Sequence, residues 1–500
     1  MKRALCTLAA VSFLVSPAAG QVSPPSGAVS DTQAVLINSP GFVISQPGSY
    51  RVARNLSSAS TVSNLITVNA SNVTIDLGGH LLSGGGRGVD IGGAVSNVVV
   101  RNGTFTGQAD NAIEGPSTGA GNLLIEDVVA RDLNGGLFCF STPNMIIRDV
   151  IVSNTAGAGI AVGDGSILER VTMSDIGGNG MNVQEFVQVR NVTMRNIGGI
   201  GIRSDGRLHA ESVLIESTGS EGIVGASTAF IRDCHVRNAG RFAPPTRSVA
   251  APSTDPLADG SGWPEPVDDV VPGPFVSEEG LVYYEAGDAT RSATDGEDGI
   301  RVGIDSLVID CSVVLSTEDG IALGTGSKAT GCSSSDNSGA GFIALNNAKF
   351  EDCQAYSNTG AGFSIGSDGD VRSCNASSNT GAGYLFSLDG LVADSTANNN
   401  SGGGVIVGDD GTVERCKIEN NSTFGIDVNG TGCRIDSNHL AINLGNGIQL
   451  DSSSNLVVRN FLENDNIFNT PGQNNVIGQI ITTNPATLTS STGAWANFQF

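Results

Sequence analysis

One six-residue motif decides the fold of this chain. It reads Asn358-Thr359-Gly360-Ala361-Gly362-Phe363 and returns as Asn379-Thr380-Gly381-Ala382-Gly383-Tyr384, with every residue number higher by 21. Its last glycine keeps this spacing throughout a longer series, at Gly299, Gly320, Gly341, Gly362, Gly383, Gly404 and Gly425. A large apolar residue follows each of them, namely Ile300, Ile321, Phe342, Phe363, Tyr384, Val405 and Ile426. A self-similar period of this length marks a solenoid, in which every repeat forms one coil.

The repeats predict strands rather than helices. A helical repeat needs ten or more residues with a 3.6-residue period in each element. Here the apolar runs are short, as in Lys349–Cys353, and Gly, Asn, Ser and Thr separate them, which is typical of strands and turns. We therefore expect three short strands per coil, with coils about 4.8 Å apart and equivalent side chains stacked in ladders. The recurring asparagines, from Asn337 to Asn421, can link successive coils through their side-chain amides.

The same register extends in both directions from this stretch. Gly159, Gly180, Gly201 and Gly222 again follow the period of 21, whereas the step from Gly222 to Gly299 is 77. This longer step equals one coil plus an insertion. Weaker coils begin near Leu65, and a last one follows Gly447. We expect about sixteen coils with this period, forming a rod roughly 75 Å long.

At this point the chain resembles a known group of proteins. Its stacked asparagine and glycine–apolar repeats, and the opening Ser71-Asn72-Val73-Thr74-Ile75-Asp76-Leu77-Gly78-Gly79, are similar to those of right-handed parallel β-helix proteins of the pectate-lyase-like superfamily. The resemblance covers about residues 30–470. It implies an all-β right-handed parallel β-helix, to which the step from Gly222 to Gly299 adds one long inserted loop. It does not imply one activity, because the group includes lyases, hydrolases, epimerases, phage spikes and adhesins.

The two ends of the chain differ from the repeats. Residues 1–20 are predicted to be a signal peptide, with Lys2 and Arg3 before an apolar stretch and Ala18-Ala19-Gly20 before the cleavage point. We therefore expect an exported protein, in the periplasm, outside the cell or on its surface. Residues 21–64 are predicted to be a lead-in and cap, residues 65–465 the β-helix with an insertion at 241–296, and residues 466–500 a second cap. No later segment is apolar and long enough to span a membrane.

Charge narrows the possible partners. The chain carries a net charge of −24, which argues against nucleic acid and anionic membranes. It also disfavours polyanionic substrates unless a cation bridges them. The sequence leaves the oligomeric state open.

Cysteines occupy one rung of the repeat. Cys311, Cys332, Cys353 and Cys374 follow the period of 21, and Cys416 resumes the series after Ser395. Parallel side chains one coil apart are farther from each other than the usual Cβ separation of a disulfide. We expect buried thiols that pack like small apolar residues, and neither disulfides nor a tetrahedral metal site.

The candidate site lies beside the insertion. The two residues before the repeat glycine are small or neutral in most coils, but here they become Ser220-Glu221, Glu297-Asp298 and Glu318-Asp319. Carboxylates stacked about 5 Å apart repel one another and call for a cation, a raised pKa or a function. Glu221, Glu297, Asp298, Glu318 and Asp319 are hard oxygen ligands that suit Ca²⁺. Glu221, Asp298 and Asp319 could alternatively supply the carboxylate pair of a glycoside hydrolase, and a solvated acidic turn is the third interpretation.

No catalytic signature decides between enzyme and binding protein. The motifs of polygalacturonases, alginate epimerases and pectate lyases are absent, and the four histidines lie on separate coils. The first hypothesis is a carbohydrate-related protein that binds or cleaves a polysaccharide on the lateral face beside the insertion, as a polysaccharide lyase or glycoside hydrolase if it is an enzyme. The alternative is a non-catalytic structural or adhesion protein outside the cell. A metal-binding β-helix is a third possibility.

A low-charge strip should lie on the outside of the strand that follows the repeat glycine. It includes Ala322, Ile343, Leu385 and Ile406, with Arg301 and Asp427 at its ends. We expect the insertion or a partner chain to cover this strip.

Overall fold

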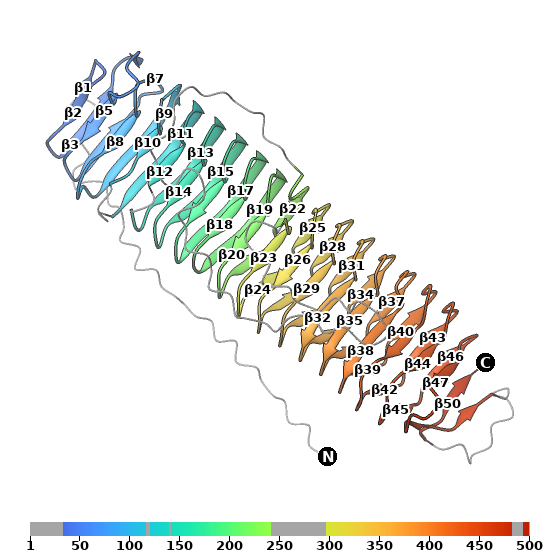
Figure 1. The fold of residues 1–500 in the computed structure, drawn as a ribbon. Helices are drawn as coiled ribbons and strands as arrows, with labels where there is room; N and C mark the ends of the chain where they lie inside the picture. Colours follow the sequence, from blue (N-terminus) through green and yellow to red (C-terminus); the bar gives the residue numbers. More distant parts are fainter. Residues whose placement is uncertain (1–33, 117–120, 140–141, 242–296, 483–493, 500) are drawn as a thin grey trace, which may run out of the picture.

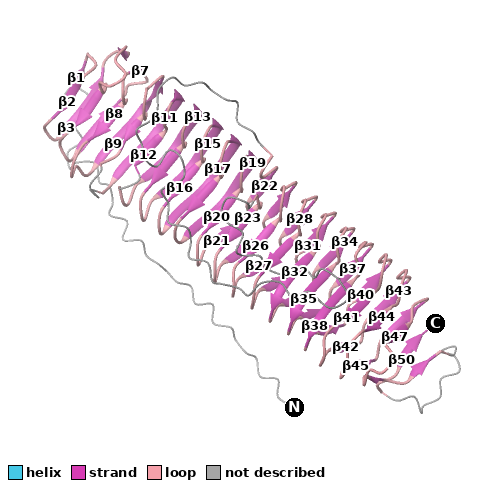
Figure 2. Cartoon of the chain, viewed as in Figure 1, coloured by secondary structure: helices cyan, strands magenta, loops and turns pink. Residues whose placement is uncertain are grey.

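The chain forms a straight rod of stacked coils. The computed structural model describes residues 34–116, 121–139, 142–241, 297–482 and 494–499. These residues form strands and turns and contain no helix, as Figure 2 shows. The N-terminal coils lie at one end of the rod and the C-terminal coils at the other (Figure 1). Neighbouring coils pair through parallel strands, so the predicted parallel β-solenoid is confirmed.

Most coils contribute one strand to each of three lateral faces, and in the others one longer strand spans the second and third faces. The first face, which begins after the repeat glycine, holds β2 (Phe42–Ile44), β5 (Ile66–Val68), β8 (Val89–Ile91), β10 (Ile113–Glu114), β12 (Leu137–Cys139), β14 (Ile160–Val162), β16 (Met181–Val183), β18 (Ile202–Ser204), β20 (Ile223–Gly225), β23 (Ile300–Val302), β26 (Ile321–Leu323), β29 (Phe342–Ala344), β32 (Phe363–Ser367), β35 (Tyr384–Leu388), β38 (Val405–Asp409), β41 (Ile426–Val428), β44 (Ile448–Leu450) and β47 (Ile467–Asn469). The second face holds β1 (Val35–Ile37), β3 (Gly48–Val52), β6 (Val73–Asp76), β21 (Phe230–Arg232), β24 (Leu307–Ile309), β27 (Lys328–Thr330), β30 (Lys349–Glu351), β33 (Asp370–Arg372), β36 (Leu391–Ala393), β39 (Thr412–Glu414), β42 (Arg434–Asp436), β45 (Leu456–Val458) and β48 (Val476–Ile477). The third face holds β4 (Leu56–Ser58), β7 (Leu81–Gly84), β22 (His235–Arg237), β25 (Ser312–Val314), β28 (Ser333–Ser335), β31 (Gln354–Tyr356), β34 (Asn375–Ser377), β37 (Thr396–Asn398), β40 (Lys417–Glu419), β43 (His439–Ala441), β46 (Phe461–Glu463) and β50 (Asn497–Gln499), with β49 (Ile480–Ile481) beside β50. Six longer strands run across the second and third faces without a break: β9 (Val98–Thr106), β11 (Leu123–Leu133), β13 (Ile146–Thr155), β15 (Ile167–Ile176), β17 (Val187–Ile197) and β19 (Leu208–Thr218).

Single residues in the left-handed backbone region make the corners of the coil. In the coil that begins at Asn347, the residues Asn347, Asp352 and Ser357 each have a φ of 55°. The same positions return in the next coil as Asp368, Ser373 and Ser378. Asn and Asp tolerate this conformation better than most residues, because their short polar side chains bond locally. This explains why the corners are rich in Asn, Asp and Ser.

Apolar ladders fill the inside of the rod. The residues after the repeat glycine, from Ile160 to Ile426, are all fully or almost fully buried, as predicted. The ring of Phe363 stacks on Phe342 at 4.7 Å and on Tyr384 at 5.1 Å between centroids. Stacking of equivalent side chains therefore builds one continuous core, which no coil could form alone.

The asparagine ladder links the coils through the side-chain amides, also as predicted. The Asn337 amide donates to the Asn358 side-chain oxygen at 2.9 Å, and this pattern continues to Asn443, whose amide donates to Asp465 at 2.7 Å. The intermediate bonds are Asn358 to Asn379, Asn379 to Asn400, Asn400 to Asn421 and Asn421 to Asn443. Successive coils are thus tied together at one buried corner.

The cysteine ladder consists of buried free thiols. The described side chains Cys234, Cys311, Cys332, Cys353, Cys374, Cys416 and Cys433 form no disulfide. Burial raises the pKa of Cys416 to about 12 and that of Cys433 to about 11, so both stay protonated. The thiols pack as small apolar residues, and the prediction of buried, unbridged cysteines is confirmed for these positions.

The stack is longer at both ends than the expected sixteen coils. The first face contains eighteen strands, because β2 lies in the lead-in and β47 follows the last coil read from the sequence. Eighteen rungs correspond to a rod of about 80 Å. No helix among the described residues is long and apolar enough to cross a membrane.

The coil register continues across the insertion. Ile223 in β20 pairs directly with Ile300 in β23, so these residues lie on adjacent rungs although 77 positions separate them in the sequence. Residues 242–296, the predicted insertion apart from its first residue, lie outside the described residues, as do residues 1–33 with the predicted signal peptide.

Candidate functional site

The predicted carboxylates do form one row at a corner of the rod. Glu221, Asp298 and Asp319 immediately precede the glycines that open β20, β23 and β26, and these three strands pair in register. The three acidic side chains therefore occupy adjacent rungs at the start of the first face. Glu221 and Asp298 are each only 2% exposed.

Two of these carboxylates bond to the backbone of the next coil. Asp298 Oδ1 accepts the Asp319 N–H at 3.1 Å, and Asp319 Oδ1 accepts the Ala340 N–H at 2.6 Å. Asn179 does the same in an earlier coil, where its side-chain oxygen accepts the Ile200 N–H at 2.9 Å. A polar acceptor on this rung thus has a structural use, which an uncharged amide can also fulfil.

Arg301 offsets the negative charge of the row. Its Nε lies 3.0 Å from Asp298 Oδ2, and this arginine projects outward from β23. Burial opposes its charge, but Asp298, Glu221 and Glu318 raise the pKa of Arg301. The repulsion expected from the sequence is therefore reduced by a cation that belongs to the chain itself.

Glu221 has the most unusual environment in the row. Burial raises its pKa, against the hydrogen bond that the Ser220 hydroxyl donates to it. Glu297, one residue before the row, accepts a hydrogen bond from the Thr317 hydroxyl, and Glu318 is partly buried. A carboxyl with a raised pKa thus lies one rung from a carboxylate that pairs with an arginine.

The structure does not test the calcium prediction. Among residues 34–241 and 297–499, with the gaps given above, no three His, Cys, Asp or Glu side chains are grouped so that they could hold a metal ion. The row uses several of its oxygens for hydrogen bonds and for Arg301. Calcium binding by Glu221, Glu297, Asp298, Glu318 and Asp319 stays a prediction.

The low-charge strip on the first face is half-buried by its own neighbours in the rod, and its cover by the insertion or a partner chain stays a prediction. Arg301, Ala322, Ile343, Leu385 and Ile406 are all half-buried although they project away from the core. The next residue along the strip, Asp427, is only 8% exposed. Asp427 Oδ1 has no hydrogen-bond partner, and burial together with Asp451 raises the pKa of this carboxyl to about 7.

The third face carries a different kind of surface. A hollow of 240 Å³ crosses β34, β37 and β40 and is lined by Asn375, Ser377, Thr396, Asn398, Lys417 and Glu419. These side chains point outward on three adjacent rungs. The Thr396 hydroxyl donates to Asn375 at 2.7 Å, and Lys417 pairs with Glu419 at 2.8 Å. The hollow therefore presents amides, hydroxyls and one ion pair to solvent.

The comparison with protein families points to one architecture. Residues 290–412 match the family described as right handed beta helix region. The chain resembles right-handed parallel β-helix proteins, as its repeats predicted. No curated protein matches the sequence.

Several solved structures show a distant likeness to this chain. The A-module of the Azotobacter vinelandii mannuronan C-5 epimerase AlgE4 is 13% identical, with 82% of this chain and 88% of that chain covered and a TM-score of 0.26. Tailspike protein 3 of bacteriophage CBA120 is 10% identical, with coverage of 91% and 59% and a TM-score of 0.30. The pectate lyase Pel9A is 11% identical, with coverage of 71% and 70% and a TM-score of 0.25. Likenesses of this degree say nothing about the activity of this protein.

A second charged cluster lies near the N-terminal end of the first face. Arg87 contacts Asp90 at 2.8 Å, Asp110 at 2.9 Å and Glu114 at 3.9 Å. Burial raises the pKa of Glu114 to about 7, against the opposing effect of Arg87. The sequence did not predict this cluster, because the N-terminal coils do not follow the period of 21.

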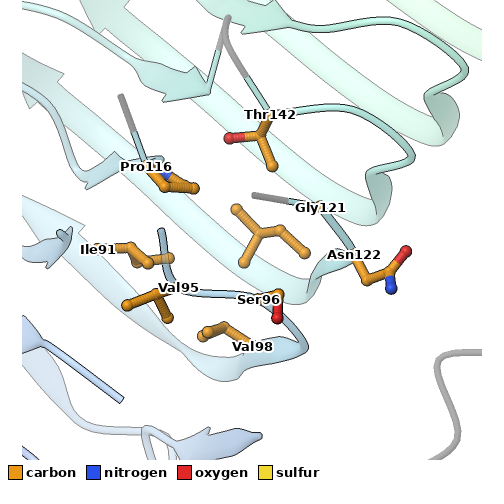
Figure 3. Close-up of a pocket in the computed structure, with 9 residues that line it drawn as sticks. Ile91, Val95, Ser96, Val98, Pro116, Gly121, Asn122 and Thr142 are labelled. Carbon is orange, nitrogen blue, oxygen red and sulfur yellow. The ribbon is translucent and has the colours of Figure 1, made fainter. Parts of the chain in front are cut away.

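Another crevice among the described residues is apolar. It lies between the coils of β8, β9 and β11, and Ile91, Val95 and Val98 converge on it while Asn122 points away (Figure 3). It has no room for a water molecule. We assign it no role beyond packing.

The third-face hollow was also not predicted from the sequence. The repeat does contain a pattern that indicates the hollow, because Asn, Ser and Thr recur at the same two positions of successive coils. Ionisable residues mark candidate sites most clearly in a sequence, whereas uncharged polar side chains do not stand out in an Asn- and Ser-rich chain.

Proposed function

We propose that this protein binds a polysaccharide along a lateral face of the rod. The observation that carries the proposal is the shallow hollow across three adjacent rungs of the third face, where polar side chains recur at the spacing of the coils. Rungs about 4.8 Å apart repeat the same hydrogen-bonding groups along the axis. A linear polymer that repeats its own hydroxyl groups is the ligand that suits such a surface.

Two physical features support a sugar polymer over other ligands. The net charge of −24 disfavours nucleic acid and anionic membranes. The hollow is open and lined by side chains of Asn, Ser and Thr, which donate and accept hydrogen bonds, whereas sites for small apolar ligands are enclosed and mostly apolar.

Cleavage of the polysaccharide is a second candidate, favoured by one observation. Burial raises the pKa of Glu221, while Asp298 on the adjacent rung is paired with Arg301 at 3.0 Å. A carboxyl group with a raised pKa beside a carboxylate that pairs with a cation is typical of an acid and a nucleophile or base. Rungs about 5 Å apart match the separation in retaining glycoside hydrolases. Asp319 would be the third member of this proposed catalytic set, beside the insertion.

Binding and cleavage can be tested separately. Affinity electrophoresis of the wild-type protein through gels that contain different polysaccharides should show retardation by at least one of them. A reducing-end assay on the polysaccharide that binds then tests cleavage, with Glu221→Gln as the variant and Lys349→Ala, a change at an exposed residue of the second face, as its control. Loss of reducing-end release in Glu221→Gln alone would support the catalytic assignment.

The opposite results are equally clear. Absence of retardation by every polysaccharide would overturn the proposed function and favour the structural or adhesion alternative. Binding without any release of reducing ends would leave a binding protein and remove the proposed catalytic role of Glu221, Asp298 and Asp319.

A further inference from the structure

The third face carries a strip of ten outward side chains without a single charge. We define this neutral strip as the outward residues of β25, β28, β31, β34 and β37. They are Ser312, Val314, Ser333, Ser335, Gln354, Tyr356, Asn375, Ser377, Thr396 and Asn398. A neutral surface of this length is unexpected on a chain with a net charge of −24.

The contrast with the second face shows that the neutrality is local. On the same coils, β27, β30 and β33 present Lys328, Lys349, Glu351, Asp370 and Arg372 to solvent. Lys328 pairs with Glu351 at 2.5 Å, and Arg372 pairs with Asp370 at 2.8 Å. Charged residues therefore occur in these coils, but on the second face rather than on the neutral strip.

We infer that the neutral strip is the polysaccharide-binding site and that its ligand is an uncharged polysaccharide rather than a polyuronate. This inference rests on the proposed function and names its site and substrate class. Amide side chains donate and accept hydrogen bonds, and hydroxyl side chains do both as well, so the strip can pair with sugar hydroxyls in either role.

The strip offers no cationic side chain that would pair with the carboxylates of a uronic acid polymer. Recognition of carboxylates normally uses Arg or Lys. The adjacent rung holds Lys417, but this lysine is already paired with Glu419 at 2.8 Å. The net negative charge of the chain would in addition repel a polyanion over a distance of about one Debye length.

Tyr356 gives the strip an aromatic contact. Its side chain is 53% exposed, and it lies in register with Ser335 on one side and Ser377 on the other. A tyrosine has an apolar ring and a polar hydroxyl group. Such residues are frequent at binding interfaces where one end of the side chain is in apolar contact and the other end stays in contact with water. The ring is well placed to pack against the apolar side of a sugar.

The hollow adjoins this tyrosine. It begins one rung after Tyr356, at Asn375 and Ser377, and continues over Thr396 and Asn398 to Lys417 and Glu419. Together the tyrosine and the hollow occupy four adjacent rungs, which is about 14 Å from the first to the last. This length suits several consecutive sugars of a chain that lies along the rod.

The inference can be tested with defined polysaccharides and three variants. Binding of dextran, galactomannan, polygalacturonate and alginate is measured by affinity electrophoresis and by calorimetry for the wild-type protein. The variants are Tyr356→Ala, the double variant Asn375→Ala/Thr396→Ala, and Lys349→Ala as the control. Lys349 lies on the same coil as Tyr356 but on the second face.

The expected result is binding of a neutral polysaccharide, with an affinity at least about tenfold lower in Tyr356→Ala and in the double variant. Lys349→Ala should bind like the wild type. All three changes concern outward side chains, so unchanged melting temperatures would confirm that the fold is intact.

Each contrary outcome has its own meaning. Binding of polygalacturonate or alginate alone would overturn the neutral substrate class but preserve the proposed function. Binding of a neutral polysaccharide that both strip variants retain would overturn the location. Absence of binding by all four polysaccharides in every protein would overturn this inference, and wider screening would then decide on the proposed function itself.

Discussion

The side-chain amide of Asn358 donates to the side-chain oxygen of Asn379 at 3.0 Å, and the backbone N–H of Asn358 donates to the same oxygen at 3.0 Å. The Asn379 amide in turn donates to Asn400 and to the carbonyl of Ala355. Every polar atom of this buried side chain is therefore used. The asparagine ladder therefore links stacked coils and at the same time gives these buried polar groups their hydrogen-bond partners.

Replacing Asn379 by leucine should destabilise the rod strongly. The change leaves the backbone N–H and the amide of Asn358 without their acceptor in a buried corner, and each orphaned group costs about 1–3 kcal/mol. We expect a loss of about 3 kcal/mol or more in the free energy of unfolding, measured by urea denaturation. Thr380→Ala, a change at the exposed neighbour, is the control and should have little effect. A similar stability of both variants would show that the ladder is not important for cohesion between coils.

Replacing Phe363 by aspartate should prevent folding or cost several kcal/mol. The ring is fully buried and stacks on Phe342 and Tyr384, so the variant would place an unpaired charge between two aromatic rings. Phe363→Leu keeps an apolar side chain and should cost only about 1 kcal/mol. Thermal unfolding followed by circular dichroism can rank the two variants. A soluble Phe363→Asp protein with wild-type stability would contradict the inward orientation of this residue.

Ile442 should be a position where a substitution stabilises the protein. It occupies a corner with φ of 58°, a strained conformation for a β-branched residue, and its side chain is 53% exposed. Asn420 and Asn464, one coil before and one coil after, have the same conformation. Ile442→Asn should raise the free energy of unfolding by about 1 kcal/mol. Leu444→Asn is the matched control, since Leu444 is 78% exposed and lies outside the left-handed region. An equal effect of both changes would trace the gain to lost surface apolarity instead of relieved strain.

The sequence predicted those parts of the structure that follow the period of 21. The buried position of Phe363, the bonds from Asn358 to Asn379 and the free thiol of Cys353 all follow from stacking identical rungs. The N-terminal coils were harder to predict, because the step from Val73 to its partner Val98 is longer than this period. The first coil was therefore predicted as a cap.

The candidate site was only partly predictable. The row of Glu221, Asp298 and Asp319 was found from its spacing, but its hydrogen bonds to the next coil and its arginine partner depend on side-chain directions that a sequence does not display. The burial of Asp427 was missed for the same kind of reason. The position of Asp427 in its strand predicts a side chain that points outward. How deeply such a side chain is buried depends on the neighbouring elements, which the strand pattern does not show.

The stability of the protein should depend on pH through Asp427. The folded protein raises the pKa of this carboxyl to about 7 from 3.8, chiefly by burial and further by Asp451. As the pH rises from about 4 to 7, the unfolded chain loses this proton before the folded one does, so the folded state becomes less stable. Asp427→Asn should therefore match the wild type at pH 4. Above pH 7 it should be more stable by roughly 2–4 kcal/mol.

Thermal unfolding at several pH values can measure this difference. Asp389→Asn, a change at an exposed aspartate of a neighbouring corner, is the control and should leave the pH profile unchanged. A stability difference between Asp427→Asn and the wild type that does not vary with pH would contradict the neutral state of Asp427 in the folded protein.

The calcium prediction requires variants that remove charge without removing hydrogen bonds. Alanine at Asp298 and Asp319 would delete the acceptors of the Asp319 and Ala340 N–H groups and would destabilise the corner with or without an ion. The double variant Asp298→Asn/Asp319→Asn keeps an acceptor oxygen on both rungs, as Asn179 does naturally.

If Ca²⁺ binds the row, the wild-type melting temperature should rise with added CaCl₂, and the asparagine variant should lose most of that rise. Calorimetric titration should show the matching loss of affinity. A calcium-induced shift that is equal in both proteins would place the ion elsewhere. The absence of a shift in the wild type would leave the row as acceptors of the neighbouring coil, with Arg301 as the cation that offsets its charge.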